Sequence, residues 1–245
     1  MKPVLKVSEL TKKYKNDRGI IDISFEVEQG DIFGLLGPNG SGKTTIMKII
    51  TGLSHADKGS VQIFGNNILK ESLKEVGCLI EEPAIYEYLT ARENLKLAAN
   101  YYDEIKKPRI DDILTQTGLI EHADKKVRKY TPEMKQRLGI ALAFISKPKL
   151  IILDEHNNKL DSNGIEEIKK MILKHSRLGA TFLISSHRPH EIESMCNKVG
   201  IIKEGRILEV VSMRNALEEC ENFKKYYLMQ VGGKEIYEAN KSWNN

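Results

Sequence analysis

Hydrophobic and polar positions alternate at the start of the chain and change to a helical spacing further along. Residues 4–10 (VLKVSEL) and 20–37 (IIDISFEVEQGDIFGLLG) alternate and are rich in Val, Ile and Phe, which is typical of half-buried strands. From residue 44 the stretch TTIMKIITGL carries apolar residues at helical intervals, and Gly52 is the expected end of that helix. The chain is therefore predicted to run through strands, a glycine-rich loop and a helix, in that order.

Residues 82–146 are predicted to be mostly helical, because the segments 90–105 and 109–120 have helical periodicity and few strand signals. Beyond them, the pattern predicts a strand over 149–155, a helix over 164–179, a strand over 180–187, a helix over 190–199 and a hairpin around Glu204-Gly205. Strands that alternate with helices indicate an α/β fold with a mostly parallel sheet whose faces are covered.

The same pattern divides the chain into four segments. We expect the first part of a core in 1–81, a helical subdomain in 82–146, the second part of the core in 147–215, and a C-terminal extension in 216–245. The extension carries no motif that indicates a role.

Composition narrows the class of protein. The chain has 245 residues, 40% of them hydrophobic and 29% charged, and its 38 basic residues are interleaved with 34 acidic ones, which does not favour nucleic acid as a partner. Its three cysteines lack the spacing of a disulfide framework or a zinc site, which favours a reducing, cytoplasmic compartment. No segment resembles a signal peptide or a membrane-spanning helix, so any membrane role is expected to depend on a partner.

The strongest chemical motif is a glycine-rich loop between a predicted strand and a predicted helix. It fits the pattern GxxxxGK[ST], in which backbone N–H groups surround the β-phosphate of a nucleotide, the lysine reaches the β- and γ-phosphates and the hydroxyl binds Mg²⁺. The alternative is a glycine-rich turn with an incidental lysine. We expect ATP with Mg²⁺ to be bound by Gly37, Pro38, Asn39, Gly40, Ser41, Gly42, Lys43, Thr44 and Thr45.

Two further motifs follow predicted strands. Asp154 and Glu155 end the strand LIILDE, where Asp154 would hold Mg²⁺ and Glu155 would polarise the attacking water as a general base. His187 follows the next strand and would contact the γ-phosphate. The alternatives are a solvated strand end for the acidic pair and an ordinary surface residue for the histidine.

The order of these motifs along the chain resembles that in the ATP-binding domain of ABC transporters, over residues 4–215. The order is GPNGSGKTT, a helical insert, LIILDE with Leu160-Asp161, and ISSH. The resemblance implies a P-loop NTPase core with a mostly parallel sheet, an N-terminal antiparallel β part and a helical insert. It also implies that Tyr14 stacks on adenine, unless it is simply an exposed tyrosine at a strand end. Glu81 stands at the family's glutamine position as a Mg²⁺ ligand, and Asp161 belongs to the loop between subunits.

Glu81 and the stretches 80–99 and 134–144 are similar to the lantibiotic-immunity and bacitracin-resistance branch of that family. This similarity implies an ATP-hydrolysing subunit that pairs with a membrane-spanning subunit at the inner face of the cell membrane and exports antimicrobial peptides. Two copies, or a pair of ATP-binding subunits, would act together. The membrane subunit would dock beside residues 82–89, including Tyr86 and Tyr88, unless these tyrosines pack inside the helical subdomain.

The sequence departs from the family at the signature loop, where Tyr130-Thr131-Pro132-Glu133-Met134 replaces a Leu-Ser-Gly-Gly-Gln type of segment. Thr131 keeps the hydroxyl that would contact the ATP of the partner subunit, but Pro132 lacks an N–H and Glu133 adds a negative charge. The same residues predict a well-capped helix start.

Because the signature loop is altered, a nucleotide-binding module with impaired hydrolysis stays open as an alternative. A soluble ABC protein acting on ribosomes or DNA is disfavoured by the chain length.

Overall fold

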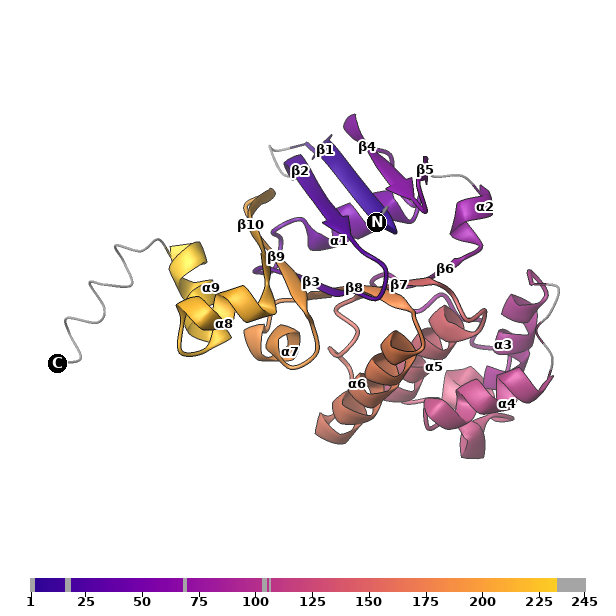
Figure 1. Cartoon of the computed structure of the whole chain (residues 1–245). Coiled ribbons are helices and arrows are strands. Elements are labelled where there is room, and N and C mark those ends of the chain that lie inside the picture. The colour runs from indigo at the N-terminus through magenta and orange to yellow at the C-terminus, as the bar shows by residue number, and fades with distance from the viewer. Residues whose placement is uncertain (1–2, 16–18, 68–69, 103–104, 106, 233–245) are drawn as a thin grey trace. The chain divides into compact units, whose positions relative to one another are not determined.

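The chain divides into two compact units in the computed structural model, which describes residues 3–15, 19–67, 70–102, 105 and 107–232 (Figure 1). The first unit comprises Met1–Ile68 and Leu183–Asn245, and the second comprises Leu69–Phe182. None of the described helices combines the length and apolar character that crossing a membrane requires.

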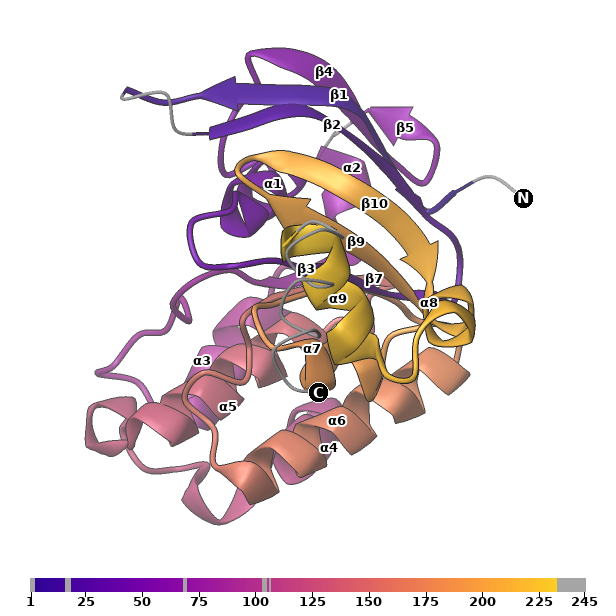
Figure 2. The same ribbon diagram turned by 90° about the vertical axis from the view of Figure 1, so that its left-hand side faces the viewer.

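An antiparallel sheet opens the first unit, as the alternating pattern predicted. Its strands lie in the order β2-β1-β4-β5 (Figure 2). Ile23, Phe25 and Val27 on β2 are buried while the residues between them are exposed, so one face of this sheet belongs to the core. The bounds are β1 (Leu5–Lys13), β2 (Gly19–Val27), β4 (Lys58–Ile63) and β5 (Asn66–Asn67).

A second set of strands in the first unit carries the phosphate loop. β3 (Ile32–Leu36) is buried along its whole length and pairs in parallel with β9 (Lys198–Lys203), which forms the predicted hairpin with β10 (Arg206–Ser212). The other neighbour of β3 is β8 (Thr181–Ser186), whose last four residues belong to this unit. A buried, uniformly apolar strand such as β3 is typical of a parallel sheet with both faces covered.

The described residues of the first unit also form the helices α1 (Lys43–Ile50), α7 (Pro189–Glu193), α8 (Met213–Glu219) and α9 (Phe223–Gly232). The predicted helix over 190–199 is too long, because Val199 already lies in β9, where it pairs with Gly34 and Val211. The C-terminal extension contains the end of α8 and all of α9: Phe223 and Tyr226 are buried, and the Tyr226 hydroxyl donates to Glu209 on β10 at 2.7 Å. Residues 233–245 lie outside the described part of the chain.

The second unit contains the parallel pair β6 (Val76–Leu79) and β7 (Leu150–Asp154) and most of the helices. The helix predicted over 90–105 ends earlier, at Ala99, with Asn100 as its C-cap. The helices and 3-10 turns are α2 (Lys70–Leu73), α3 (Ala91–Ala99), α4 (Lys107–Gln116), η1 (Ile120–His122), η2 (Val127–Lys129), α5 (Pro132–Phe144) and α6 (Ser162–Arg177).

Candidate functional site

The glycine-rich loop follows β3 and leads into α1, in the strand–loop–helix context that the motif requires. The Lys43 side chain is buried, and its ammonium donates to the carbonyl oxygens of Gly37 at 2.8 Å and Pro38 at 3.1 Å. The lysine therefore lies folded back over its own loop. Its ammonium therefore lies inside the loop, and a bound phosphate would compete with the Gly37 and Pro38 carbonyls for this donor.

The loop is shaped so that only small residues fit part of it. Gly42 has a φ of +108°, and a Cβ there would approach Ile20 Cγ2 to 2.5 Å; a Cβ on Gly37 would approach the Ile202 carbonyl oxygen to 2.1 Å. Thr44 and Thr45 form the first turn of α1, which has no side-chain cap and no acidic residue. An uncapped, acid-free helix start leaves backbone N–H groups suited to an anion.

Ser41 provides an independent indication of a ligand. Its hydroxyl is buried and has no hydrogen-bond partner among the residues that the structure describes, which is unusual for a buried polar atom. A phosphate oxygen would satisfy it. The residues present therefore fit a nucleotide phosphate, and the oxygen donors at Thr44 and Asp154 are of the type that Mg²⁺ prefers.

His187 emerges beside this loop, as predicted from its place after the strand. The Gly37 N–H donates to the Ser186 carbonyl at 3.2 Å, so the end of β8 and the start of the loop are directly linked. Glu191 fixes the residues on both sides of the histidine: it accepts from the Ser186 hydroxyl at 2.6 Å and from the Arg188 guanidinium at 3.0 Å. Glu191 is not among the residues predicted from the sequence, where its i, i+3 spacing to Arg188 was the available signal.

Tyr14 follows the end of β1 at the hairpin that packs on the phosphate loop. Lys13 pairs with Gly19, and the backbone of Gly19 lies against Gly42. Tyr14 is 44% exposed, with the Lys12 ammonium 5.9 Å from the centroid of its ring. An exposed ring at this position is available for stacking.

Asp154 and Glu155 lie at the carboxyl end of β7 in the second unit, and Asp154 is buried. Glu155 has a φ of +42°, and its carboxylate accepts from the Asn158 side-chain amide at 2.7 Å. Glu81 lies at the same strand edge, because Leu79 and Leu153 are partners in the parallel pair, and its φ is +54°. Left-handed backbone is uncommon for a glutamate, and Glu9 and Glu204 in the first unit also adopt it, so it does not by itself mark a site.

The loop after Glu155 is tied to helix α5. Gln136, buried on α5, donates its side-chain amide to the His156 carbonyl at 2.9 Å. The neighbouring Asn157 side chain is also buried and has no hydrogen-bond partner among the described residues. This segment therefore retains hydrogen-bonding capacity that a ligand or a partner chain could use.

Thr131 starts α5 as predicted: its hydroxyl accepts from the Met134 N–H at 3.1 Å, and Pro132 is the first helical residue. Asp161 starts α6 in the same way, accepting from the Gly164 N–H at 2.7 Å. The two helix starts are adjacent, because a Cβ on Gly164 would lie 2.9 Å from Glu133 Oε1 and 3.2 Å from Asp161 Oδ1.

The Glu133 carboxylate is paired along its own helix. Arg137 donates to Glu133 at 3.0 Å and also to Glu167 on α6 at 2.7 Å, and its side chain is only 11% exposed. The negative charge that the signature loop carries is thus partly compensated by one shielded guanidinium. The i, i+4 spacing of Glu133 and Arg137 predicts this pair, but Glu167 is brought in only by the packing of α6.

A groove with aromatic walls lies on the helical part of the second unit. Its volume is about 270 Å³, and Tyr86 and Tyr101 on its rim are 49% and 81% exposed. The sequence left open that Tyr86 and Tyr88 pack inside the helical subdomain. Neither tyrosine is buried, since Tyr88 is 67% exposed. The groove is lined by Ala84, Tyr86, Asn94, Leu97, Ala98, Tyr101, Tyr102, Leu142 and Ile145.

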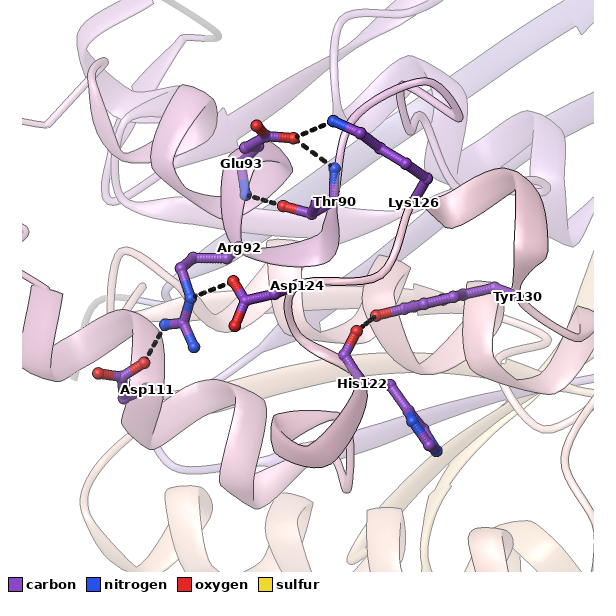
Figure 3. A network of polar contacts seen from close by, with 8 residues as sticks. All are labelled: Thr90, Arg92, Glu93, Asp111, His122, Asp124, Lys126 and Tyr130. Atoms are coloured by element: carbon purple, nitrogen blue, oxygen red, sulfur yellow. Dashed lines mark hydrogen bonds and ion pairs between the residues drawn. The ribbon is translucent and has the colours of Figure 1, made fainter.

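A polar network connects the segment after Tyr86 to the segment before Thr131 (Figure 3). Arg92 pairs with Asp111 and Asp124, and Lys126 donates to Glu93 at 3.1 Å. Backbone N–H groups of Val127 and Arg128 donate to the carbonyls of residues 89 and 87, at 2.9 and 2.8 Å. Each of these contacts crosses between the two segments or fastens one of them to α4.

Known proteins share these motifs over most of the chain. The profile of the ABC transporter family matches residues 20–158. The uncharacterized ABC transporter ATP-binding protein YhcH of Bacillus subtilis (strain 168) is 36% identical over 94% of this chain and 76% of its own length. The bacitracin transport ATP-binding protein BcrA of Bacillus licheniformis is 39% identical over 93% of this chain and 76% of its own.

A lantibiotic transport ATP-binding protein, SrtF of Streptococcus pyogenes, is 35% identical over 93% of this chain and 97% of its own. Among solved structures, one described as the ATP binding subunit of an ABC transporter aligns with a TM-score of 0.85 and 26% identity, covering 93% of this chain and 99% of that one. With its phosphate loop, its fold and these relatives, the chain belongs to the ABC transporter family as an ATP-binding, ATP-hydrolysing subunit.

Proposed function

We propose that this ATPase powers the export of an antimicrobial peptide of the bacitracin or lantibiotic type, and so gives its cell self-protection or resistance against that peptide. The observation that carries this proposal is the similarity to bacitracin and lantibiotic transport ATP-binding proteins over 93% of the chain. The peptide itself would be handled by the membrane-spanning partner, since the chain supplies the nucleotide chemistry.

Deleting the gene in its host tests the export function. We expect the inhibitory concentration of bacitracin or of a lantibiotic to fall several-fold, and to be restored by the wild-type gene but not by a Glu155→Gln variant. Unchanged sensitivity to both peptides, with normal ATPase activity of the purified chain, would overturn peptide export and leave the ATPase assignment intact.

The roles we propose for the nucleotide residues follow their chemistry. Residues 37–45 bind the phosphates, Tyr14 stacks on adenine, and Thr44, Asp154 and Glu81 hold Mg²⁺, which neutralises phosphate charge when bound. Glu155 takes a proton from the attacking water, and His187 donates a hydrogen bond to the γ-phosphate.

We further propose that two ATP-binding chains act as a pair at the cytoplasmic face of the membrane. Thr131 and Asp161 lie at adjacent helix starts, whose N-terminal dipoles and N–H groups suit the phosphates of a nucleotide bound by the partner chain. The unsatisfied Asn157 amide supports a contact of the same kind.

The aromatic groove is our candidate docking surface for the membrane-spanning subunit. It combines exposed tyrosines with apolar side chains, the composition that protein interfaces favour. In a purified transporter, Leu97→Glu is expected to weaken binding of the membrane subunit by about 10-fold or more, because a carboxylate would be buried without a partner.

Leu217→Glu is the matched control for this experiment. Leu217 is 41% exposed, against 38% for Leu97, and it lies on α8 in the first unit. Co-purification of the two subunits should be lost in the first variant alone, while both chains keep their own ATPase activity. Equal binding of both variants would exclude the groove as the docking surface.

The altered signature loop favours a second candidate function, a nucleotide-binding module with slow hydrolysis. The Glu133–Arg137–Glu167 contacts argue for retained hydrolysis, because they offset the charge of Glu133. Arg137→Gln is then expected to lower the ATPase rate about 10-fold, which corresponds to roughly 1.4 kcal/mol in the barrier, by exposing the phosphate to uncompensated carboxylates.

The double variant Glu133→Gln/Arg137→Gln should recover most of that loss, since it removes the carboxylate that Arg137 offsets. Steady-state rates measured alongside thermal unfolding separate this effect from instability. A double variant as slow as Arg137→Gln, with the same unfolding temperature, would show that Glu133 does not limit hydrolysis.

A further inference from the structure

A second cavity, of about 400 Å³, lies in the second unit away from every nucleotide motif. It is bordered by the loops that precede β7 and β8, where the Thr181 N–H donates to the Lys149 carbonyl at 2.9 Å. Asp154 and Glu155 stand at the opposite end of β7, roughly 15 Å further along the strand. The cavity is therefore a separate feature of this unit.

Cationic side chains dominate the lining of this cavity. Arg109, Lys147, Lys149 and Lys174 contribute positive charge, and Asp112 is the one carboxylate among the lining residues. Lys149 is paired with Glu75 at 2.6 Å. Lys147 and Lys174, in contrast, form no ion pair with any residue that the structure describes. Neither lysine is therefore held in an ion pair, and the Asp112 carboxylate acts on Lys174 only through a longer-range electrostatic attraction.

Arg109 forms the shielded base of the cavity. Its side chain is 11% exposed, and it donates to the Ile145 carbonyl at 3.2 Å and to Asp112 at 2.6 Å. The Phe144 carbonyl is a third acceptor for the same guanidinium. The carbonyls of Phe144, the last residue of α5, and of its C-cap Ile145 therefore already accept hydrogen bonds and do not face an anion in the cavity as unpaired acceptors.

An ordered chain of hydrogen bonds continues from Asp112 along one wall. Gln116 donates to Asp112 at 2.8 Å, and the His175 Nε2–H donates to the Gln116 side-chain oxygen at 3.0 Å. The His175 ring packs edge-on against Phe144, with 5.0 Å between centroids. Burial, followed by the charges of Arg109 and Lys174, keeps the pKa of His175 below its ordinary value. The wall is therefore pre-organised, and its imidazole senses the local charge.

We propose that this cavity binds a small polyanion that carries a phosphate group, with Lys147 and Lys174 supplying the charge and Arg109, paired with Asp112, forming the base. Its volume is in the range of ordinary small-molecule sites. Phosphate is an anion that amine and guanidinium donors bind well, and it carries more charge than a single carboxylate. Both a free phosphate compound and the headgroup of an anionic lipid carry this chemistry.

Titration with inorganic pyrophosphate, followed by NMR of the His175 ring, tests the site without relying on ATPase activity. We expect a saturable shift of the His175 signal, with affinity at least about 10-fold weaker in Lys147→Gln/Lys174→Gln, as for loss of charge-assisted hydrogen bonds. Lys170→Gln, an exposed lysine earlier on α6, is the control and should bind as wild type.

Vesicles distinguish the two sources of phosphate. A shift with pyrophosphate indicates a free ligand, whereas a shift only with vesicles containing phosphatidic acid, and not with phosphatidylcholine alone, indicates a lipid headgroup. No saturable shift with either, or equal affinity in the double variant and wild type, overturns the proposal. Because the readout is at His175, phosphate bound at residues 37–45 does not affect the conclusion.

Discussion

Exchanging Glu155 for glutamine is expected to lower the steady-state ATPase rate by about two to three orders of magnitude while ATP binding is kept, as for loss of a general base. The amide has nearly the shape of the carboxylate and can still accept from Asn158, so the loop after β7 should keep its conformation. What is lost is the ability to take a proton from water. ATP-bound chains should then accumulate as pairs.

Two measurements check this result. The rate of the wild-type chain, measured over a range of protein concentrations, should rise faster than linearly if two chains form each site. Glu166→Gln, which removes an exposed acid from α6, should behave as wild type. A Glu155→Gln variant that hydrolyses ATP at more than about a tenth of the wild-type rate would assign the proton transfer to another group.

Exchanging Lys43 for methionine is expected to weaken ATP binding by about 10- to 100-fold, since a charge-assisted hydrogen bond to phosphate is removed. The buried ammonium also holds the carbonyls of Gly37 and Pro38. Without it these carbonyls lose their donor, so the loop itself should become less ordered. We therefore expect a lower unfolding temperature for the ligand-free chain as well.

Lys43→Arg separates the two effects, because it keeps the positive charge but not the compact ammonium. Equilibrium binding of a fluorescent ATP analogue and thermal unfolding, each measured for both variants, give the comparison. If Lys43→Met bound ATP as tightly as wild type, the lysine would have a role in the loop alone.

Local patterns predicted the features that depend on neighbouring residues. The hydroxyl of Thr131 followed by Pro132 predicted the start of α5, and the glycine spacing predicted the phosphate loop between β3 and α1. The helix over 190–199 was predicted too long, because Asn197 to Val199 continue a helical pattern. In the structure Val199 pairs with β3 and β10 and belongs to β9.

Features that depend on packing between distant segments could not be predicted in this way. Glu167 meets Arg137 only because the starts of α5 and α6 are adjacent, and the extension beyond Ala216 is ordered by the contact of Tyr226 with Glu209. The cationic cavity joins α4, α6 and the loop before β7, so no single stretch of sequence displays it. The roles assigned to individual nucleotide residues remain predictions.

The polar network, whose side-chain contacts appear in Figure 3, has a thermodynamic consequence. Arg92, Lys126 and the backbone bonds at residues 127 and 128 fasten the segment behind the aromatic groove to the segment that ends at Thr131. If the groove binds the membrane subunit and Thr131 contacts ATP, one coupling free energy links the two binding events. By whatever factor docking of the membrane subunit raises the affinity for ATP, ATP must raise the affinity for the membrane subunit by the same factor.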